Sequence, residues 1–123
     1  MTIIEAINRI DSLKPNNYTQ EDKLFWLSNL DGIIKTEIID THEGSENVTF
    51  NGYDVDTALD TVLIVPVPYD DIYLKWLEAQ IDYTNGETQR YENSMIAFNN
   101  AYETFQRFYN RTHMPKGKSI KFF

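Results

Sequence analysis

Residues of the types that usually carry out chemistry are few in this sequence. It contains no cysteine, which excludes disulfide bonds, thiolate metal ligands and thiol nucleophiles together. Its two histidines, His42 and His113, are far apart and do not form the HExxH pattern of a zinc protease. The GxSxG, P-loop and GxGxxG patterns are absent as well. We therefore expect a protein that is not an enzyme, with no catalytic, cofactor-binding or metal-binding residues.

The acidic residues give two weak signals of chemistry. Asp54, Asp56 and Asp60 resemble the start of a calcium loop, because hard cations need several oxygen ligands close together. The glycine and the closing glutamate of such a loop are missing, so the pattern favours a solvated acidic loop. The neighbouring Asp70 and Asp71 could do acid–base work, but at the start of an expected helix they also complement the helix dipole.

Composition and charge limit the class of protein. The chain has 123 residues, 41% of them hydrophobic and 14% aromatic, which predicts one folded domain rather than a disordered chain. The net charge is −8, and between Asp31 and Asp82 the acidic residues far outnumber Lys35 and Lys75. Residues 111–123, in contrast, contain basic residues and no acidic one. An acidic body repels nucleic-acid phosphates and can attract the basic tail of another copy.

The N-terminal third predicts two helices. Apolar residues at helical spacing predict a helix over residues 2–13, which Pro15 ends. A second helix is predicted from the N-cap Thr19, with Asp22 in a capping box, to about residue 40. Gly32 inside it suggests the close approach of another backbone. The expected core side of this helix is Leu27, Leu30, Ile34 and Ile38, widened by Trp26 and Ile33.

The helical spacing disappears between residues 42 and 67. Glycine, asparagine and aspartate replace it, which predicts a long connection. Within the connection, residues 48–50 and 61–65 are apolar and β-branched enough to form two short strands that pair as a minor β-hairpin. Connections of this length are usually functional or mobile.

The rest of the chain is arranged around residues 68–115, which predict two helices joined at Asn85-Gly86. The first begins at Pro68 or Tyr69, and the second runs from about Glu87 to Thr112. The first is apolar on two sides, so it is either sandwiched inside a bundle or covered by a different subunit. The second carries one stripe of large side chains, formed by Tyr91, Met95, Phe98, Tyr102, Phe105 and Tyr109.

These elements predict a mainly α fold. We expect a four-helix bundle as a single domain over residues 1–115, with the long loop, the minor β-hairpin, and an extended basic tail over residues 116–123. The two long helices also carry many asparagines and glutamines, where solvent-facing helices usually prefer Glu and Lys. This amide-rich surface is either an ordinary polar face or an interface with another subunit.

The residues of the 68–115 stretch carry a resemblance to a known family. The pattern PYDxxYxxWLEAQIDYxNGE, followed by YxNS, FN and the closing YNRTHMP, resembles head-tail connector, or adaptor, proteins of long-tailed phages and prophages of Gram-positive bacteria. The opening AINRIDSLKPNNYTQEDKLFWLSNLDG is similar too, so the resemblance covers most of the chain except the 41–61 loop and the tail.

The resemblance implies a helical structural protein that forms a ring, commonly dodecameric, below the portal and lines the DNA exit channel. The implied partners are other copies of the chain, the portal protein, and a tail-completion or stopper protein, while DNA passes through without sequence-specific binding. The implied location is the virion, and the host cytoplasm during assembly. The N-terminal segment does not have the pattern of a signal peptide, and we expect no membrane association.

The tail is the expected contact with a neighbouring subunit or the portal, with its two terminal phenylalanines as anchors and its lysines as charges around them. Deletion of residues 116–123 is then expected to leave the monomer folded but unable to form rings or bind the portal. The candidate residues of the oligomer or portal interface are Trp76, Tyr83, Asn93, Arg111, His113, Lys116, Lys118, Lys121, Phe122 and Phe123.

Two other functions stay open at this point. The chain could be another small virion protein that completes the head or the tail. It could also be an acidic protein that mimics nucleic acid and binds a DNA-handling partner, in which case its carboxylates should lie in paired rows.

Overall fold

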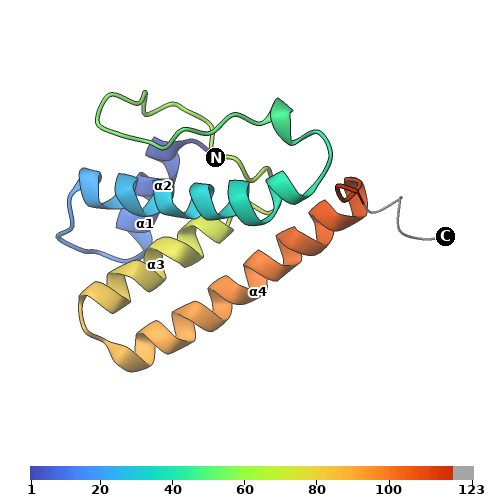
Figure 1. Cartoon of the computed structure of the whole chain (residues 1–123). Coiled ribbons are helices and arrows are strands. Elements are labelled where there is room, and N and C mark those ends of the chain that lie inside the picture. Colours follow the sequence, from blue (N-terminus) through green and yellow to red (C-terminus); the bar gives the residue numbers. More distant parts are fainter. Residues whose placement is uncertain (118–123) are drawn as a thin grey trace.

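The computed structural model describes residues 1–117, which contain four α-helices (Figure 1). Two short 3₁₀ turns, η1 and η2, follow the second helix. The elements are α1 (Ile3–Leu13), α2 (Gln20–Glu37), η1 (Ile39–Thr41), η2 (Ser45–Asn47), α3 (Ile72–Thr84) and α4 (Thr88–Thr112). The prediction of a mainly helical chain with four helices is therefore confirmed.

The first two helices begin where the sequence predicts. The hydroxyl of Thr2 accepts a hydrogen bond from the backbone N–H of Glu5, whose carboxylate accepts from the N–H of Thr2. Thr19 and Asp22 form the same reciprocal pair at the start of α2. Each capping box satisfies two backbone groups that the first turn of a helix leaves without partners. The predicted capping box at Thr19 is thus confirmed.

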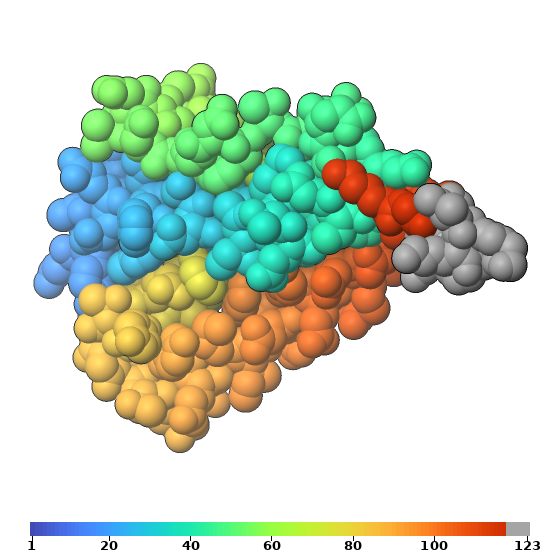
Figure 2. All heavy atoms as spheres, viewed as in Figure 1, coloured from blue at the N-terminus to red at the C-terminus, as the bar shows by residue number. Residues whose placement is uncertain are grey.

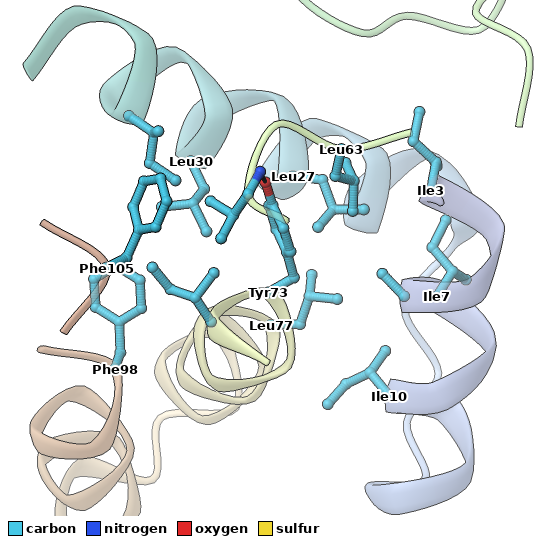
Figure 3. Close-up of a cluster of buried hydrophobic side chains, with 14 of the residues drawn as sticks. Ile3, Ile7, Ile10, Leu27, Leu30, Leu63, Tyr73, Leu77, Phe98 and Phe105 are labelled. Carbon is cyan, nitrogen blue, oxygen red and sulfur yellow. Dashed lines mark hydrogen bonds between the residues drawn. The ribbon is translucent and has the colours of Figure 1, made fainter. Parts of the chain in front are cut away.

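Helix α3 lies at the centre of the molecule and contacts the other three helices. Its side chains Tyr73, Leu77 and Ile81 are fully buried, against Leu27 and Leu30 of α2, Ile7 and Ile10 of α1, and Phe98 and Phe105 of α4 (Figure 3). Of the two alternatives for α3, a position inside the bundle is therefore the correct one, since the other helices cover most of both apolar sides. Tyr83, at its end, is the exception and stays exposed.

Helices α3 and α4 form an antiparallel hairpin that ends at Asn85-Gly86 (Figure 1). Gly86 has φ +75°, a left-handed conformation that residues with a side chain rarely adopt, which confirms the predicted stop. Along α4 the predicted stripe faces the core: Phe98, Phe105 and Tyr109 are buried, and the other three members are half-buried.

The predicted β-hairpin is wrong. The described residues form no strand, and the segment 59–63 instead runs beside the start of α1, where the N–H groups of Ile3 and Ile4 donate to the carbonyls of Thr61 and Leu59. Val62 forms an isolated antiparallel bridge with Thr2. The unpaired N–H groups at the start of α1 and the backbone of 59–63 satisfy each other, which removes the need for a second strand.

Three smaller predictions need correction. Helix α3 begins at Ile72, after a turn that holds Asp70 within 3.4 Å of the N-terminal ammonium group. Ile33 of α2 is exposed and does not widen the core side. At Gly32, an added Cβ would meet the Phe50 ring at 3.6 Å, so a side chain and not another backbone lies over this glycine.

A buried carboxylate fixes the long connection to the helices. Asp31 of α2 has no exposed surface and accepts hydrogen bonds from the hydroxyls of Tyr53 at 2.5 Å and Tyr73 at 2.6 Å, and from the N–H of Ile64 at 3.2 Å. The Tyr73 hydroxyl in turn accepts from the N–H of Val65. Burial raises the pKa of Asp31, and the three hydrogen bonds oppose that shift.

Two ion pairs hold α1 and the turn after it. Lys23 is buried and lies 2.6 Å from Asp11, and it also donates to the carbonyl of Tyr18. Lys14 lies 2.7 Å from the buried carboxylate of Asp82 on α3, which also accepts a hydrogen bond from the hydroxyl of Ser94 on α4. The second cluster joins three elements and fixes the closed end of the α3–α4 hairpin, next to the Asn85-Gly86 turn.

Candidate functional site

The turn between α3 and α4 carries an open groove of about 710 Å³, lined by Tyr83, Tyr91, Glu87 and Glu92 and by the turn itself. The rings of Tyr83 and Tyr91 lie with their centroids 5.2 Å apart, and Tyr83 is 66% exposed. A large aromatic side chain so exposed at the tip of a helical hairpin is a typical anchor for a partner. We refer to this groove as the hairpin groove.

The ionisable side chains that line the hairpin groove are mostly acidic. Glu87 Oε2 is buried but accepts no hydrogen bond from the described residues, and Arg90 Nη1 lies 3.7 Å away, beyond hydrogen-bond distance. Glu92 is exposed on the next turn of α4. Asp82 also lines the groove, but Lys14 and Ser94 already occupy its carboxylate. A buried oxygen without a donor favours a ligand that brings a cation or an N–H group.

An uncharged stripe runs along the exposed side of α4 in its first half, between Arg90 and Glu92 at its edges. Gln89, Asn93, Ile96 and Asn100 follow one another at helical spacing and are all exposed, and Ile96 is 60% exposed. We refer to these four residues as the amide face. An exposed isoleucine among amides, on a helix whose other side packs against the core, fits a polar interface with a small apolar centre.

The other end of α4 contains a cluster of aromatic rings that sequence spacing does not show. His113 stacks on Tyr109 with ring centroids 3.7 Å apart, and His42 lies 4.9 Å from the same tyrosine. The two ring nitrogens of buried His42 face the carbonyl oxygen of Ile38 and Oδ1 of Asn110. The structure thus brings the two distant histidines together at the ends of η1 and α4.

Residues 114–116, which lead into the tail, are bonded to residues 41–43 of the same chain. Pro115 forms an antiparallel bridge with His42, Glu43 donates its N–H to the carbonyl of Met114, and Lys116 donates its N–H to the carbonyl of Thr41. The part of the tail that can reach another molecule therefore begins after Lys116. A truncation meant to leave the monomer intact must retain residues 115–117.

The candidate interface residues lie at different places in the structure. Tyr83 lies in the hairpin groove, Asn93 on the amide face, and exposed Arg111 near the C-terminal end of α4. Trp76 is half-buried and packs against the core, where its indole N–H donates to the carbonyl of Trp26 and its ring contacts Phe98. His113 and Lys116 belong to the fixed start of the tail. Lys118, Lys121, Phe122 and Phe123 lie outside the described residues.

Sequence reasoning missed three residues of these sites. The sequence pattern places Tyr91 only in the core stripe, places Ile96 on no face, and indicates for Glu87 only the start of a helix. Ile96 could have been found, because it stands three or four residues from Asn93 and Asn100 and off the apolar stripe. The unpaired oxygen of Glu87 depends on the turn geometry, which the sequence does not give.

The described residues contain no group of three or more His, Asp or Glu side chains that could hold a metal ion. In the 54–60 loop, Asp54 accepts hydrogen bonds from the N–H of Asp56 and the hydroxyl of Thr57, so this carboxylate stabilises a local turn. None of the described helices is long and apolar enough to cross a membrane.

Comparisons of this chain with protein-family models, with curated proteins and with solved structures return no match. A functional interpretation therefore depends on the surface geometry and on the sequence resemblance stated above.

Proposed function

We propose that this chain is a structural subunit of a phage head-tail connector, an adaptor that assembles with other copies into a ring below the portal and around the DNA exit channel. It acts by binding neighbouring copies and the portal. The observation that carries the proposal is the amide face of α4, which is exposed, uncharged and centred on Ile96 in a subunit whose other helices bury most of their apolar residues.

The geometry of α4 suits contact between copies. The helix has 25 residues and one long side open to solvent. Antiparallel pairing with α3 leaves the outward side of α4 exposed along its whole length (Figure 1). A contact between this face and a different surface of the next copy would be heterologous, and such contacts form a ring when the rotation between copies closes.

Two further features support the same proposal. The resemblance of residues 68–115 to connector proteins includes exposed positions such as Asn93 and Asn99, which have no role in the core. The net charge of −8 also fits a channel through which DNA slides, because an acidic lining repels phosphates and does not hold the DNA.

The test is the assembly state of the purified protein, alone and co-expressed with the portal protein of the same phage, measured by mass photometry and electron microscopy. We expect rings or a portal complex for the wild-type chain. Ile96→Glu should prevent them, because it places a charge at the centre of the contact. Val55→Glu is the matched control, since Val55 is also exposed and lies on the long connection away from α4.

Each outcome decides the proposal. Loss of assembly in Ile96→Glu with normal assembly in Val55→Glu supports it. A wild-type chain that stays monomeric beside its portal at high concentration overturns it, and so does a monomer or dimer that binds a DNA-handling protein through its carboxylates. Portal and major capsid genes next to the gene for this chain would support the virion role independently.

A further inference from the structure

The hairpin groove presents aromatic and acidic side chains to solvent at the tip of the α3–α4 hairpin. It combines the exposed ring of Tyr83, the neighbouring ring of Tyr91 and the unpaired oxygen Oε2 of Glu87. Its volume of about 710 Å³ lies within the range of pockets that bind ligands, roughly 300–1,000 Å³. Aromatic rings together with the carboxylates of Glu87 and Glu92 favour an occupant that is both aromatic and basic.

The chain itself contains a segment of this chemistry. Residues 118–123 have the sequence KSIKFF, with two lysines and two adjacent phenylalanines, and no acidic residue. The phenylalanines match the tyrosine rings, because aromatic pairs add to the energy of apolar burial. The lysines match Glu87 and Glu92, and a lysine ammonium group can donate to the oxygen of Glu87 that has no partner.

This segment cannot reach the groove of its own subunit. The groove lies at the start of α4 and the tail leaves from its end, so the 25 residues of the helix separate them by about 37 Å. Residues 118–123, fully extended, span at most about 21 Å from Gly117. The space-filling view agrees, since the hairpin and the last described residues lie at opposite ends of the molecule (Figure 2). A tail that binds in this groove must therefore come from another copy.

We propose that residues 118–123 of one copy bind in the hairpin groove of the next copy, with Phe122 and Phe123 against Tyr83 and Tyr91 and the lysines beside Glu87 and Glu92. This inference rests on the proposed function. It assigns a partner to the hairpin groove, a second surface besides the amide face. The contact is heterologous: each copy offers a tail at one end of α4 and a groove at the other. Such contacts join copies head to tail, into a ring where the rotation closes.

The test uses full-length variants in which one side of the contact is removed. Phe122→Ala/Phe123→Ala removes the aromatic anchors of the tail and keeps the groove. Tyr83→Lys removes the exposed ring of the groove and adds a charge that repels the tail. Phe25→Lys is the matched control, because Phe25 is similarly exposed, 62% against 66%, and lies on α2. Self-association is measured by sedimentation velocity.

We expect the tail variant and Tyr83→Lys each to self-associate at least about tenfold more weakly than the wild-type chain, as removal of an interface anchor does. Phe25→Lys should behave as the wild-type chain. A mixture of the tail variant and Tyr83→Lys should associate more strongly than either variant alone, because the intact tail of Tyr83→Lys can bind the intact groove of the tail variant. Higher salt should weaken the wild-type contact.

A synthetic peptide with the sequence of residues 116–123, KGKSIKFF, tests the contact without ring assembly. Added to the tail variant, it should shift the NMR signals of Tyr83 and Tyr91 and leave those of Phe25 unchanged. The inference is overturned if millimolar peptide leaves both tyrosines unchanged, or if the tail variant associates as the wild-type chain does. In that second case, loss of association in Ile96→Glu would still support the ring, so failure of this inference is distinct from failure of the proposed function.

Discussion

The carboxylate of Asp31 and the hydroxyl of Tyr73, from residues 42 positions apart in the chain, form a hydrogen bond of 2.6 Å in the interior of the bundle. Asp31 forms no ion pair with the described residues, so hydrogen bonds alone compensate its burial. The pair joins α2 to α3 and, through Ile64 and Val65, fixes the end of the long connection. Burial first, and the charge of Asp31 second, raise the pKa of Tyr73 well above its usual range.

Tyr73→Phe is expected to destabilise the protein by about 2–3 kcal/mol, because it removes one donor to Asp31 and leaves the N–H of Val65 without its acceptor. Tyr53→Phe should cost less, about 1 kcal/mol, since its hydroxyl makes one hydrogen bond in a half-buried position. Urea unfolding followed by circular dichroism measures both. Tyr102→Phe is the control, because the bond of Tyr102 to Glu37 is 3.2 Å long and exposed. Equal costs for Tyr73→Phe and Tyr102→Phe would contradict this account of the interior.

The pH dependence of stability should show the raised pKa of Asp31. Its pKa in the folded state lies above the ordinary value of 3.8, so between those two values the folded state binds more protons than the unfolded state. The stability that Asp31 contributes is therefore fully present below pH 3.8 and is lost as pH rises through the folded-state pKa. The unfolding free energy of the wild-type chain minus that of Asp31→Asn should fall as pH rises over this range. A difference that rises with pH, or does not change, would show that the pKa is not raised.

Lys14 and Asp82 should contribute strongly to stability, because Asp82 is 1% exposed and Lys14 provides its counter-charge. Lys14→Met leaves a buried carboxylate with only the hydroxyl of Ser94, and we expect a loss of about 3 kcal/mol. Arg107→Met is the matched control, since the pair with Glu103 is exposed and 3.9 Å long and should contribute less than about 0.5 kcal/mol. Thermal unfolding at one pH compares them. If Lys14→Met/Asp82→Leu is no more stable than Lys14→Met, the cost does not come from the unpaired charge.

Two glycines should respond to substitution in opposite directions. Gly32→Ala is expected to stabilise the protein by up to about 1 kcal/mol, because alanine favours a helix interior and the new Cβ makes an ordinary contact with Phe50. Gly86→Ala should destabilise it by about 1 kcal/mol, since φ there is +75°, a conformation that alanine rarely adopts. The added Cβ would meet no atom within 4 Å, so the cost would come from the backbone conformation and not from a clash. Midpoints of urea unfolding give both values. A stabilised Gly86→Ala would mean that the turn accepts another conformation.

The sequence alone determined the helices, because local signals define them. Thr19 with Asp22, Pro15 and Asn85-Gly86 act within a few residues of their own position, and the apolar spacing of α1, α2 and α4 shows which side of each is buried. The β-hairpin prediction failed because β-branched residues indicate an extended backbone but not its partner. Val62 forms a bridge with Thr2, and the carbonyls of Leu59 and Thr61 bond to the N-terminus of α1, so this segment does not pair with residues 48–50.

Only the tertiary structure decided which apolar side chains stay exposed after the helices pack. Helix α3 is apolar on two sides in the sequence, and the packing of α1, α2 and α4 around it covers both, so the exposed aromatic surface is reduced there to Tyr83 at its end. The fold likewise brought Asp31 to Tyr53 and Tyr73, His42 to His113, and Tyr83 to Tyr91. Side chains meet in three dimensions through the packing of whole elements, and that packing depends on contacts between residues far apart in the chain, which no local pattern records.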